Sequence, residues 1–256
     1  MSDWNPELYL KFKNERTAPS IDLLSKIKID NPGSIIDLGC GPGNSTQILH
    51  QKWPHSKLLG IDSSVEMIKK AKEDFPDQNW LAADISEFKS DELYGLVFSN
   101  ATLQWIPDHE ILIPGLFKLV NNNGALAVQV PANNESPLHK ALYSVSNEKK
   151  WNRYTNGCEK LLNYQSADYY YNIINPVAHV LDIWETTYYH ELLSHQGLID
   201  WYKSTGMRPF LESLPDDEKR IEFENEVLEK CRDNYKIQKN GKILYPFKRI
   251  FFIAYN

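Results

Sequence analysis

The chain has 256 residues, of which 42% are hydrophobic and 24% charged, a composition typical of a globular protein with a sizeable core. Its formal net charge of −6 argues against a protein that coats nucleic acid, because such proteins usually carry a basic excess. The cysteines, Cys40, Cys158 and Cys231, show no CxxC spacing, which argues against a disulfide framework or a structural zinc site. A polar start and the lack of an apolar run of about 18 residues predict a cytoplasmic protein without a membrane partner.

Short apolar strands alternate with amphipathic helices in the first half of the chain. The segment 6–28 is expected to be helical, and Ser63 with Ser64 is expected to open a later helix with capping-box spacing. Pro114 predicts that the helix before the fifth strand is kinked or starts late. The predicted strands are 34–38, 57–61, 80–83, 96–99 and, after a turn at 121–124, 125–130. This alternation predicts an α/β fold with a mostly parallel sheet covered on both faces.

The pattern changes after Pro131. Residues 132–175 are rich in Asn, Tyr and Ser and predict weaker helices, followed by a long strand at 179–189. Helices are expected at about 195–205 and 216–235, and a closing strand at 248–255. We therefore expect helices inserted before the last strand of the sheet.

The strongest functional signal is the sequence Asp37-Leu38-Gly39-Cys40-Gly41-Pro42-Gly43, directly after a predicted strand and before a helix. Glycines in such a turn let the backbone bend tightly and approach a ligand closely. Asp62 ends the second strand, where a carboxylate can accept hydrogen bonds from ribose hydroxyls. Asp84 follows the third strand beside Ile85, a position that suits an adenine edge between apolar walls.

A glycine-rich turn alone is weak evidence, because dinucleotide-binding enzymes and purely structural turns share it. Asp37 separates these alternatives, since a carboxylate beside the glycines repels an anionic pyrophosphate. S-adenosylmethionine has no phosphate and carries an ammonium and a sulfonium, both of which favour a nearby carboxylate. We therefore favour a methyl donor over a dinucleotide as the ligand.

The chain resembles the class I S-adenosylmethionine-dependent methyltransferases along nearly its whole length. The stretches that carry the resemblance are 2–6, 9–10, 15–16, 37–43, 60–64, 100–101, 103–105, 184, 186–190, 199–201 and 205–209. It implies a Rossmann-like, doubly wound sheet of seven strands, mostly parallel with the last strand antiparallel. It also implies methyl-ester formation on a carboxylate of trans-aconitate or a similar small polycarboxylate. The implied donor-binding residues are Asp37, Gly39, Gly41, Asn44, Asp62, Ser63, Met67, Asp84, Ile85 and Asn100.

On this interpretation, one methyltransferase domain covers residues 1–256. Its expected parts are an N-terminal helical cap at 1–30, a donor-binding core at 31–131, helical lid and acceptor elements at 132–175 and 193–245, and closing strands at 176–192 and 246–256.

Methylation of a carboxylate needs no general base, because the carboxylate is already deprotonated at neutral pH. We therefore expect neither a catalytic triad nor a metal, but cations that hold the acceptor and aromatic rings that exclude water. Arg16 shares a helical face with Tyr9, and Arg208 is expected in a rigid loop between Gly206 and Pro209. An arginine can bind a carboxylate through two parallel hydrogen bonds. The candidate acceptor-binding residues are Tyr9, Arg16, Trp105, Tyr189, His195 and Arg208.

Three alternatives to a small polycarboxylate acceptor stay open. They are another acid such as a carrier-bound malonyl group, a neutral molecule methylated on carbon or nitrogen, and a non-catalytic domain that senses the donor. Ala18 stands where the family often has an arginine, and Ala132 where it tends to have an acid, so either difference can alter the acceptor. The sequence is compatible with a monomer or a homodimer.

Overall fold

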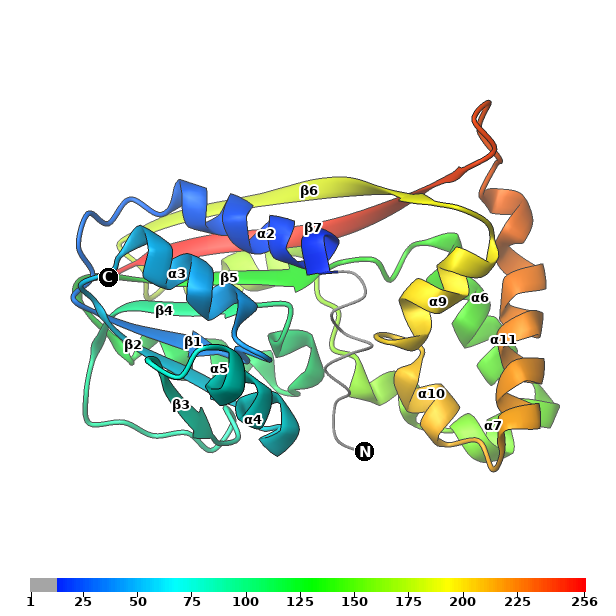
Figure 1. Cartoon of the computed structure of the whole chain (residues 1–256), viewed down its shortest axis with the longest axis horizontal. Helices are drawn as coiled ribbons and strands as arrows, with labels where there is room; N and C mark the ends of the chain where they lie inside the picture. Colours follow the sequence, from blue (N-terminus) through cyan, green and yellow to red (C-terminus); the bar gives the residue numbers. More distant parts are fainter. Residues whose placement is uncertain (1–12) are drawn as a thin grey trace. The chain divides into compact units, whose positions relative to one another are not determined.

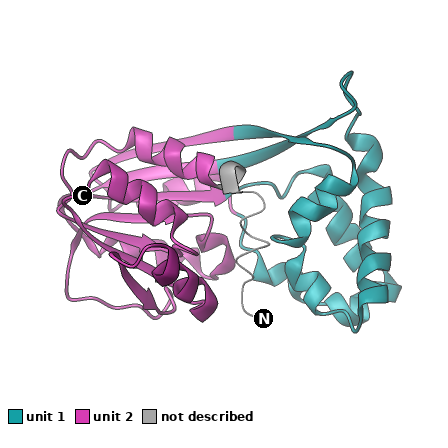
Figure 2. Ribbon diagram, in the orientation of Figure 1, with its two compact units in different colours: residues 1–2, 131–164, 187–249 teal, residues 3–130, 165–186, 250–256 magenta. Residues whose placement is uncertain are grey.

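The computed structural model describes residues 13–256, with side chains from residue 17 onward. Contacts within the chain separate two compact units (Figure 2). Among the described residues, unit 1 comprises 131–164 and 187–249, and unit 2 comprises 13–130, 165–186 and 250–256.

A seven-stranded sheet forms the centre of unit 2, and two of its strands continue into unit 1 (Figure 1). The strands are β1 Ser34–Leu38, β2 Lys57–Asp62, β3 Asn79–Ala82, β4 Tyr94–Asn100, β5 Val120–Pro131, β6 Val180–Leu192 and β7 Ile243–Tyr255. Their order is β3-β2-β1-β4-β5-β7-β6, and the pairs β1–β2, β1–β4, β2–β3 and β4–β5 are parallel. Backbone bonds from Ala132 to Lys248 and from Asn256 to Gly124 show that β7 runs antiparallel to β5. The predicted doubly wound, mostly parallel sheet is confirmed.

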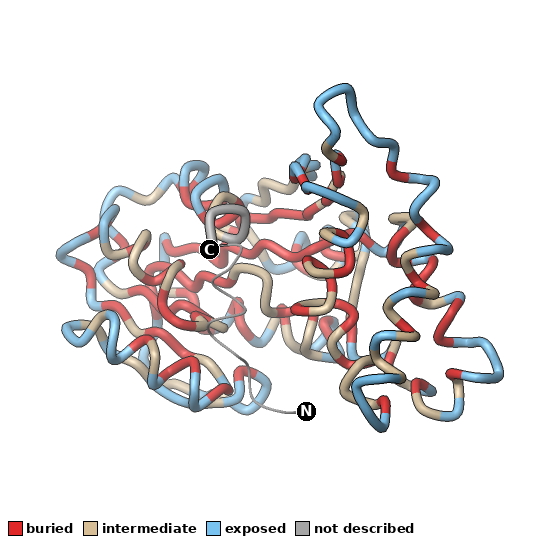
Figure 3. The backbone as a smooth tube through the Cα atoms, turned by 45° about the vertical axis from the view of Figure 1, so that its right-hand side comes forward, coloured by how far each residue is buried: buried red, intermediate tan, exposed pale blue. Residues whose placement is uncertain are grey.

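Helices cover both faces of the sheet in unit 2, which explains why its inner strands are almost continuously apolar and buried (Figure 3). These helices are α2 Lys13–Lys26, α3 Asn44–Lys52, α4 Val65–Asp74, the 3-10 turn η1 Leu103–Trp105, α5 His109–Phe117 and α8 Ala167–Ile174. The strand order reverses between β1 and β4, so right-handed crossovers place α5 on the face opposite to α3 and α4. Helix α2 packs on α3 and α8 packs on α5, although α8 falls within the predicted lid segment 132–175.

Several local predictions were wrong in detail. Helix α4 is capped by Ser64, which accepts a hydrogen bond from the Met67 amide, so the expected capping box from Ser63 does not form. The predicted turn at 121–124 is a bulge inside β5, because the three residues of β4 from Tyr94 to Leu96 face the longer stretch of β5 from Val120 to Ala125. Strand β7 begins at Ile243, five residues before the predicted start at 248.

Unit 1 consists of helices and of the ends of β6 and β7. Its helices are α6 Pro137–Ser146, α7 Lys149–Thr155, η2 Cys158–Leu161, α9 Gln196–Lys203, α10 Arg208–Glu212, α11 Asp217–Cys231 and η3 Arg232–Asn234. The predicted repeat of apolar residues places Phe223, Val227 and Cys231 on one fully buried face of α11, which packs on α6 and α9. Trp151 of α7 meets Phe223 edge-on, with ring centroids 5.1 Å apart.

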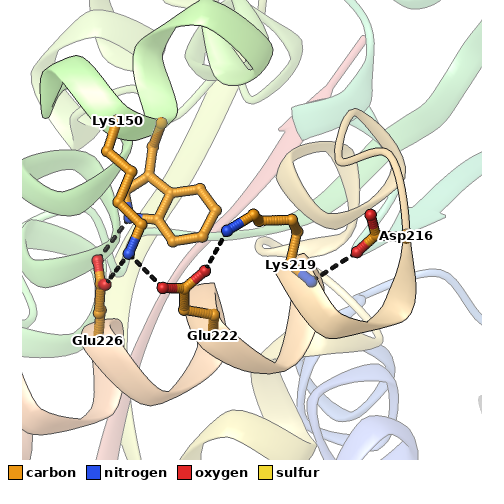
Figure 4. A network of polar contacts seen from close by, with 6 residues as sticks. Lys150, Asp216, Lys219, Glu222 and Glu226 are labelled. Carbon is orange, nitrogen blue, oxygen red and sulfur yellow. Dashed lines mark hydrogen bonds and ion pairs between the residues drawn. The ribbon is translucent and has the colours of Figure 1, made fainter.

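A network of ion pairs joins α7 to α11 at the surface of unit 1 (Figure 4). The Lys150 ammonium lies 2.5 Å from Glu222 and 2.6 Å from Glu226, and Lys219 binds the other oxygen of Glu222. The buried Trp151 indole donates to Glu226 at 2.5 Å. Exposed ion pairs of this kind each contribute about 0–1 kcal/mol to the free energy of unfolding. The buried indole bond is therefore the contact in this network that contributes most to holding the two helices together.

Candidate functional site

The carboxyl ends of β1 and β4 mark the point where the strand order reverses, and open α/β sheets bind ligands in the crevice at such a point. The glycine loop follows β1, and Asn100 ends β4. A pocket within unit 2 opens at this position. It is lined by Thr17, Ser20, Gly39, Cys40, Pro42, Asn44, Ser45 and Asn100. Three of the predicted donor-binding residues therefore share a pocket with two α2 side chains, Thr17 and Ser20, that the sequence analysis did not identify.

Two glycines of the loop have different structural tasks. Gly39 has φ +75°, and a Cβ there would lie 2.1 Å from Thr102, whose hydroxyl donates to the Gly39 carbonyl at 3.2 Å. Gly39 thus lets the loops after β1 and β4 touch. Gly41 has φ +55°, but no atom lies within 4 Å of the place where its Cβ would be. Gly41 therefore exposes bare backbone to open space, which is what close approach of a ligand requires.

Asp37 is fully buried at the end of β1. Its Oδ2 accepts hydrogen bonds from the Ser45 hydroxyl at 2.7 Å and the Thr46 hydroxyl at 2.6 Å, whereas Oδ1 has no partner among the described residues. Burial raises the pKa of Asp37 to about 6, against the lowering effect of the two hydroxyls, and nearby Asp62 adds to the rise. The Oδ1 of Asn100, at the end of the adjacent β4, is likewise buried without a described partner. Two buried acceptors at neighbouring strand ends suit a ligand that donates hydrogen bonds and carries positive charge.

Asp62 connects the glycine loop to the end of β2. Its Oδ2 accepts from the Gly41 amide at 2.9 Å, and its Oδ1 accepts from the Ser64 amide at 2.8 Å. These two bonds fix the orientation of the carboxylate beside the glycine loop. Ser63 is exposed beside it, while Met67 is buried on the first turn of α4.

The loop after β3 carries the remaining predicted donor contacts. Asp84 is exposed, and its Oδ1 accepts from the amide and the hydroxyl of Ser86 at 2.8 and 2.7 Å. Ile85 is buried and adds an apolar side chain to the same loop. Trp105 is half-buried in η1, which is held by a 2.8 Å bond between His109 Nε2 and the Leu103 carbonyl.

The structure describes the side chains of only some of the predicted acceptor-binding residues. Tyr9 lies outside the described residues, and Arg16 lies in α2 without a described side chain. In unit 1, Tyr189 is 67% exposed on β6, and His195 Nε2 donates to the Tyr235 carbonyl at 2.7 Å. The expectation that Arg208 sits in a loop was wrong.

Arg208 begins helix α10, because the proline that follows it favours the first turn of a helix. Its Nε donates to Glu212 at 2.8 Å, one helical turn along α10, and its side chain is only 13% exposed. The guanidinium is therefore held in one orientation at the start of a short helix.

Two buried polar residues of unit 1 were missed by the sequence analysis. His190 is on β6 and Arg249 on β7, and their exposed fractions are 7% and 4%. The signal was the alternation of Tyr245, Phe247 and Arg249 on the buried face of β7. A predicted strand that begins at residue 248 hides this alternation.

Cys40 lies in the glycine loop but is chemically protected. Its thiol is buried, and burial together with the nearby Asp37 and Asp62 carboxylates raises its pKa well above the ordinary value. In the part of the chain from residue 13 onward, no group of three or more His, Cys, Asp or Glu side chains could hold a metal. No helix in that part is long and apolar enough to cross a membrane.

The chain is similar to known methyltransferases over nearly its whole length. A family model described as a methyltransferase domain matches residues 29–194. The trans-aconitate 2-methyltransferases of Escherichia coli O157:H7 and Shigella flexneri are each 43% identical over 254 residues, which is 99% of this chain and 98% of each relative.

Solved structures support the fold. The YcgJ protein from Bacillus subtilis matches with a TM-score of 0.60 at 12% identity, over 93% of this chain and 98% of that one. Coclaurine N-methyltransferase bound to N-methylheliamine and SAH matches with a TM-score of 0.56 at 13% identity, over 93% of this chain and 72% of that one. At such low identity these structures show the architecture alone.

Proposed function

The chain belongs to the trans-aconitate 2-methyltransferase family of S-adenosylmethionine-dependent enzymes, and we propose that it converts trans-aconitate to a monomethyl ester. The observation that carries the donor part of this proposal is Asp37, a buried carboxylate with one oxygen lacking a described hydrogen-bond partner, beside the glycine loop. A carboxylate at this position attracts an ammonium or sulfonium and repels a phosphate.

Buried acceptors at the strand ends and hydroxyls in the pocket of unit 2 support this assignment. Asp37 and Asn100 offer acceptors to the donor's ammonium, and the hydroxyls of Thr17 and Ser20 can donate to its carboxylate. Asp62 is fixed beside the glycine loop by its bonds with the Gly41 and Ser64 amides, and a carboxylate at this strand end would accept hydrogen bonds from the ribose hydroxyls. The remaining proposed donor contacts are Gly39, Gly41, Asn44, Ser63, Met67, Asp84 and Ile85. We assign donor binding to residues 31–131.

When bound, S-adenosylmethionine supplies an electrophilic methyl group. An oxygen of the acceptor carboxylate would form the new bond to this methyl carbon, and the electron pair of the broken carbon–sulfur bond would pass to sulfur. A negative and a positive charge disappear together, and no proton moves, so the chain needs no general base. Its residues have to align the reacting atoms and exclude water, which favours the separated charges of the reactants.

Acceptor recognition is assigned to the helical segments 132–175 and 193–245, together with the cap at 1–30. The bond from Arg208 Nε to Glu212 orients the guanidinium, and an oriented guanidinium can bind a carboxylate through two parallel hydrogen bonds. The other proposed acceptor contacts are Tyr9, Arg16, Trp105, Tyr189 and His195.

The test is incubation of the purified protein with methyl-labelled donor and a panel of di- and tricarboxylates, neutral amines, phenols and a carrier-bound malonyl group, followed by identification of the labelled products and of the base-labile methyl esters among them. The proposal predicts label on trans-aconitate. Label on neutral amines or phenols alone, or on a carrier-bound malonyl group alone, contradicts it.

A matched pair of variants locates the acceptor contact. Arg208→Ala is expected to raise the KM for trans-aconitate at least tenfold while donor affinity measured by calorimetry stays within about twofold. Arg220→Ala, which removes a more exposed arginine of the same unit, serves as the control and is expected to change neither. Equal losses of donor and acceptor binding in Arg208→Ala mean that this residue is structural.

A further inference from the structure

A second polar cluster lies wholly within unit 1, on the buried face of β6 and β7. Because side chains alternate along a strand, Tyr188 and His190 share one face of β6, and Tyr245, Phe247 and Arg249 share one face of β7. The His190 ring lies 6.3 Å from the Tyr245 ring and 6.0 Å from the Phe247 ring, so the two faces form one cluster. We call these five residues the β6–β7 cluster.

Arg249 places a permanent positive charge inside this cluster. Its side chain is 4% exposed, and its guanidinium lies 4.6 Å from the Phe247 ring centroid and 5.8 Å from that of Tyr188. Burying a charged group is unfavourable unless other groups compensate for it. A guanidinium has five N–H donors in a planar fork, and a carboxylate engages two of them in parallel. The fork can therefore bind a carboxylate while it keeps other contacts.

His190 adds a neutral donor beside this charge. Its ring stacks on Trp201 with centroids 4.2 Å apart, and Nε2 is buried with no partner among the described residues. Burial, and then the charge of Arg249, lower the pKa of His190 to about 4, so the ring is neutral at pH 7. A neutral imidazole offers one N–H donor, and a buried polar atom left without a partner is unfavourable. A ligand that accepts a hydrogen bond at Nε2 removes that cost.

The hydroxyls around the cluster are also neutral donors. Burial raises the pKa of Tyr245 well above its ordinary value and that of Tyr164 in the same direction, so both stay protonated at neutral pH although the charge of Arg249 acts on each. The Asn133 amide donates to the Tyr245 hydroxyl at 2.9 Å, which leaves the phenolic proton to be donated elsewhere. One fixed cation surrounded by neutral donors and aromatic walls matches a carboxylate.

We propose that Arg249 and His190 bind a non-reacting carboxylate of the acceptor and so determine the preference of the enzyme for a tricarboxylate. This inference rests on the proposed function, because it presupposes a carboxylate acceptor. It assigns a specificity role to two residues that neither the glycine loop nor the predicted arginines include.

The experiment compares trans-aconitate with three dicarboxylates that each lack one of its carboxylates, namely mesaconate, glutaconate and itaconate. The variants are Arg249→Met and the control Arg153→Met, which removes an exposed arginine that also lies on a tyrosine ring, 4.5 Å from Tyr154. In Arg249→Met we expect kcat/KM for trans-aconitate to fall about 30-fold or more, through KM. For the one dicarboxylate that lacks the carboxylate bound by Arg249, kcat/KM of this variant is expected to stay within about threefold of the wild-type value.

Donor affinity, measured by calorimetry, is expected to stay within about twofold of wild type in both arginine variants. Arg249→Lys keeps the charge, so it is expected to retain part of the preference for trans-aconitate that Arg249→Met loses. If Arg249→Met does not fold, His190→Phe serves instead, because it keeps a ring against Trp201 and removes Nε2. It is expected to reduce the preference for trans-aconitate over the dicarboxylates.

Equal losses for all four acceptors, or no loss, overturn the inference, because a merely structural residue does not distinguish the acceptors. A wild-type protein that esterifies none of them refutes the proposed function instead. A wild-type preference for trans-aconitate that survives in Arg249→Met and His190→Phe refutes only this inference.

Discussion

Replacing Asp37 by Asn is expected to make the protein more stable at alkaline pH and weaker at binding its donor. The folded-state pKa of Asp37 is raised by burial from 3.8 to about 6. Between these two values the folded chain holds a proton that the unfolded chain has already lost, so stability falls as pH rises from about 4 to about 6. A rise of about two pKa units corresponds to about 3 kcal/mol, lost in full above pH 7. Asn has nearly the same shape and no charge, so the variant avoids this loss.

Urea unfolding at pH 4.5, 6 and 8 measures the effect. Asp37→Asn should exceed wild type by up to about 3 kcal/mol at pH 8, with the difference shrinking toward pH 4.5. Calorimetry should show donor affinity reduced by about 10- to 100-fold, because a hydrogen bond to a charged group is lost. The exposed Asp77→Asn serves as the control and should follow the wild-type curve. A variant less stable than wild type at pH 8, or one with the wild-type pH slope, refutes the reasoning.

Three further substitutions separate packing from binding. Gly39→Ala places a Cβ 2.1 Å from Thr102 at φ +75°, and it should lower the free energy of unfolding in urea by about 2 kcal/mol or more, with partial recovery in Gly39→Ala/Thr102→Gly. Gly41→Ala meets no atom within 4 Å, so urea unfolding should show a loss of only about 1 kcal/mol while calorimetry shows at least tenfold weaker donor binding. Glu226→Ala leaves the buried Trp151 N–H unsatisfied and should lower the free energy of unfolding by about 1–3 kcal/mol, as followed by near-ultraviolet circular dichroism during urea unfolding.

Elements with strong periodicity could be predicted from the sequence. The strand 34–38 matches β1 at both ends, because an apolar run followed by a glycine turn has well-defined limits. The repeat of Phe223, Val227 and Cys231 indicated the buried face of α11 for a similar reason. The glycine loop and Asp62 indicated where the polar strand ends would meet, since parallel strands bring their carboxyl ends to one edge of a sheet.

Features that depend on tertiary contacts could not be predicted. Asn121 to Gly124 is typical of a turn, but pairing with β4 keeps this stretch inside β5 as a bulge. Both Ser63 and Ser64 are good helix caps, and only the path of the backbone selects Ser64. Pro246, which is unfavourable inside a strand, obscured the start of β7 at Ile243, and with it the face that carries Arg249.

The protonation states of the buried groups fit a reaction that transfers no proton. In unit 1, burial lowers the pKa values of His139 and His190 to about 4, so neither ring can act as a general base that titrates near neutral pH. The Tyr245 hydroxyl keeps its proton because burial raises its pKa, and Arg249 stays charged at any physiological pH. In unit 2, burial raises the pKa of Asp37 to about 6, and its ionised form is the one that would attract a cation. Acid pH should therefore lower the affinity for the donor, because Asp37 becomes protonated. A rise in pH to about 9 should leave the protonation of the groups named here unchanged.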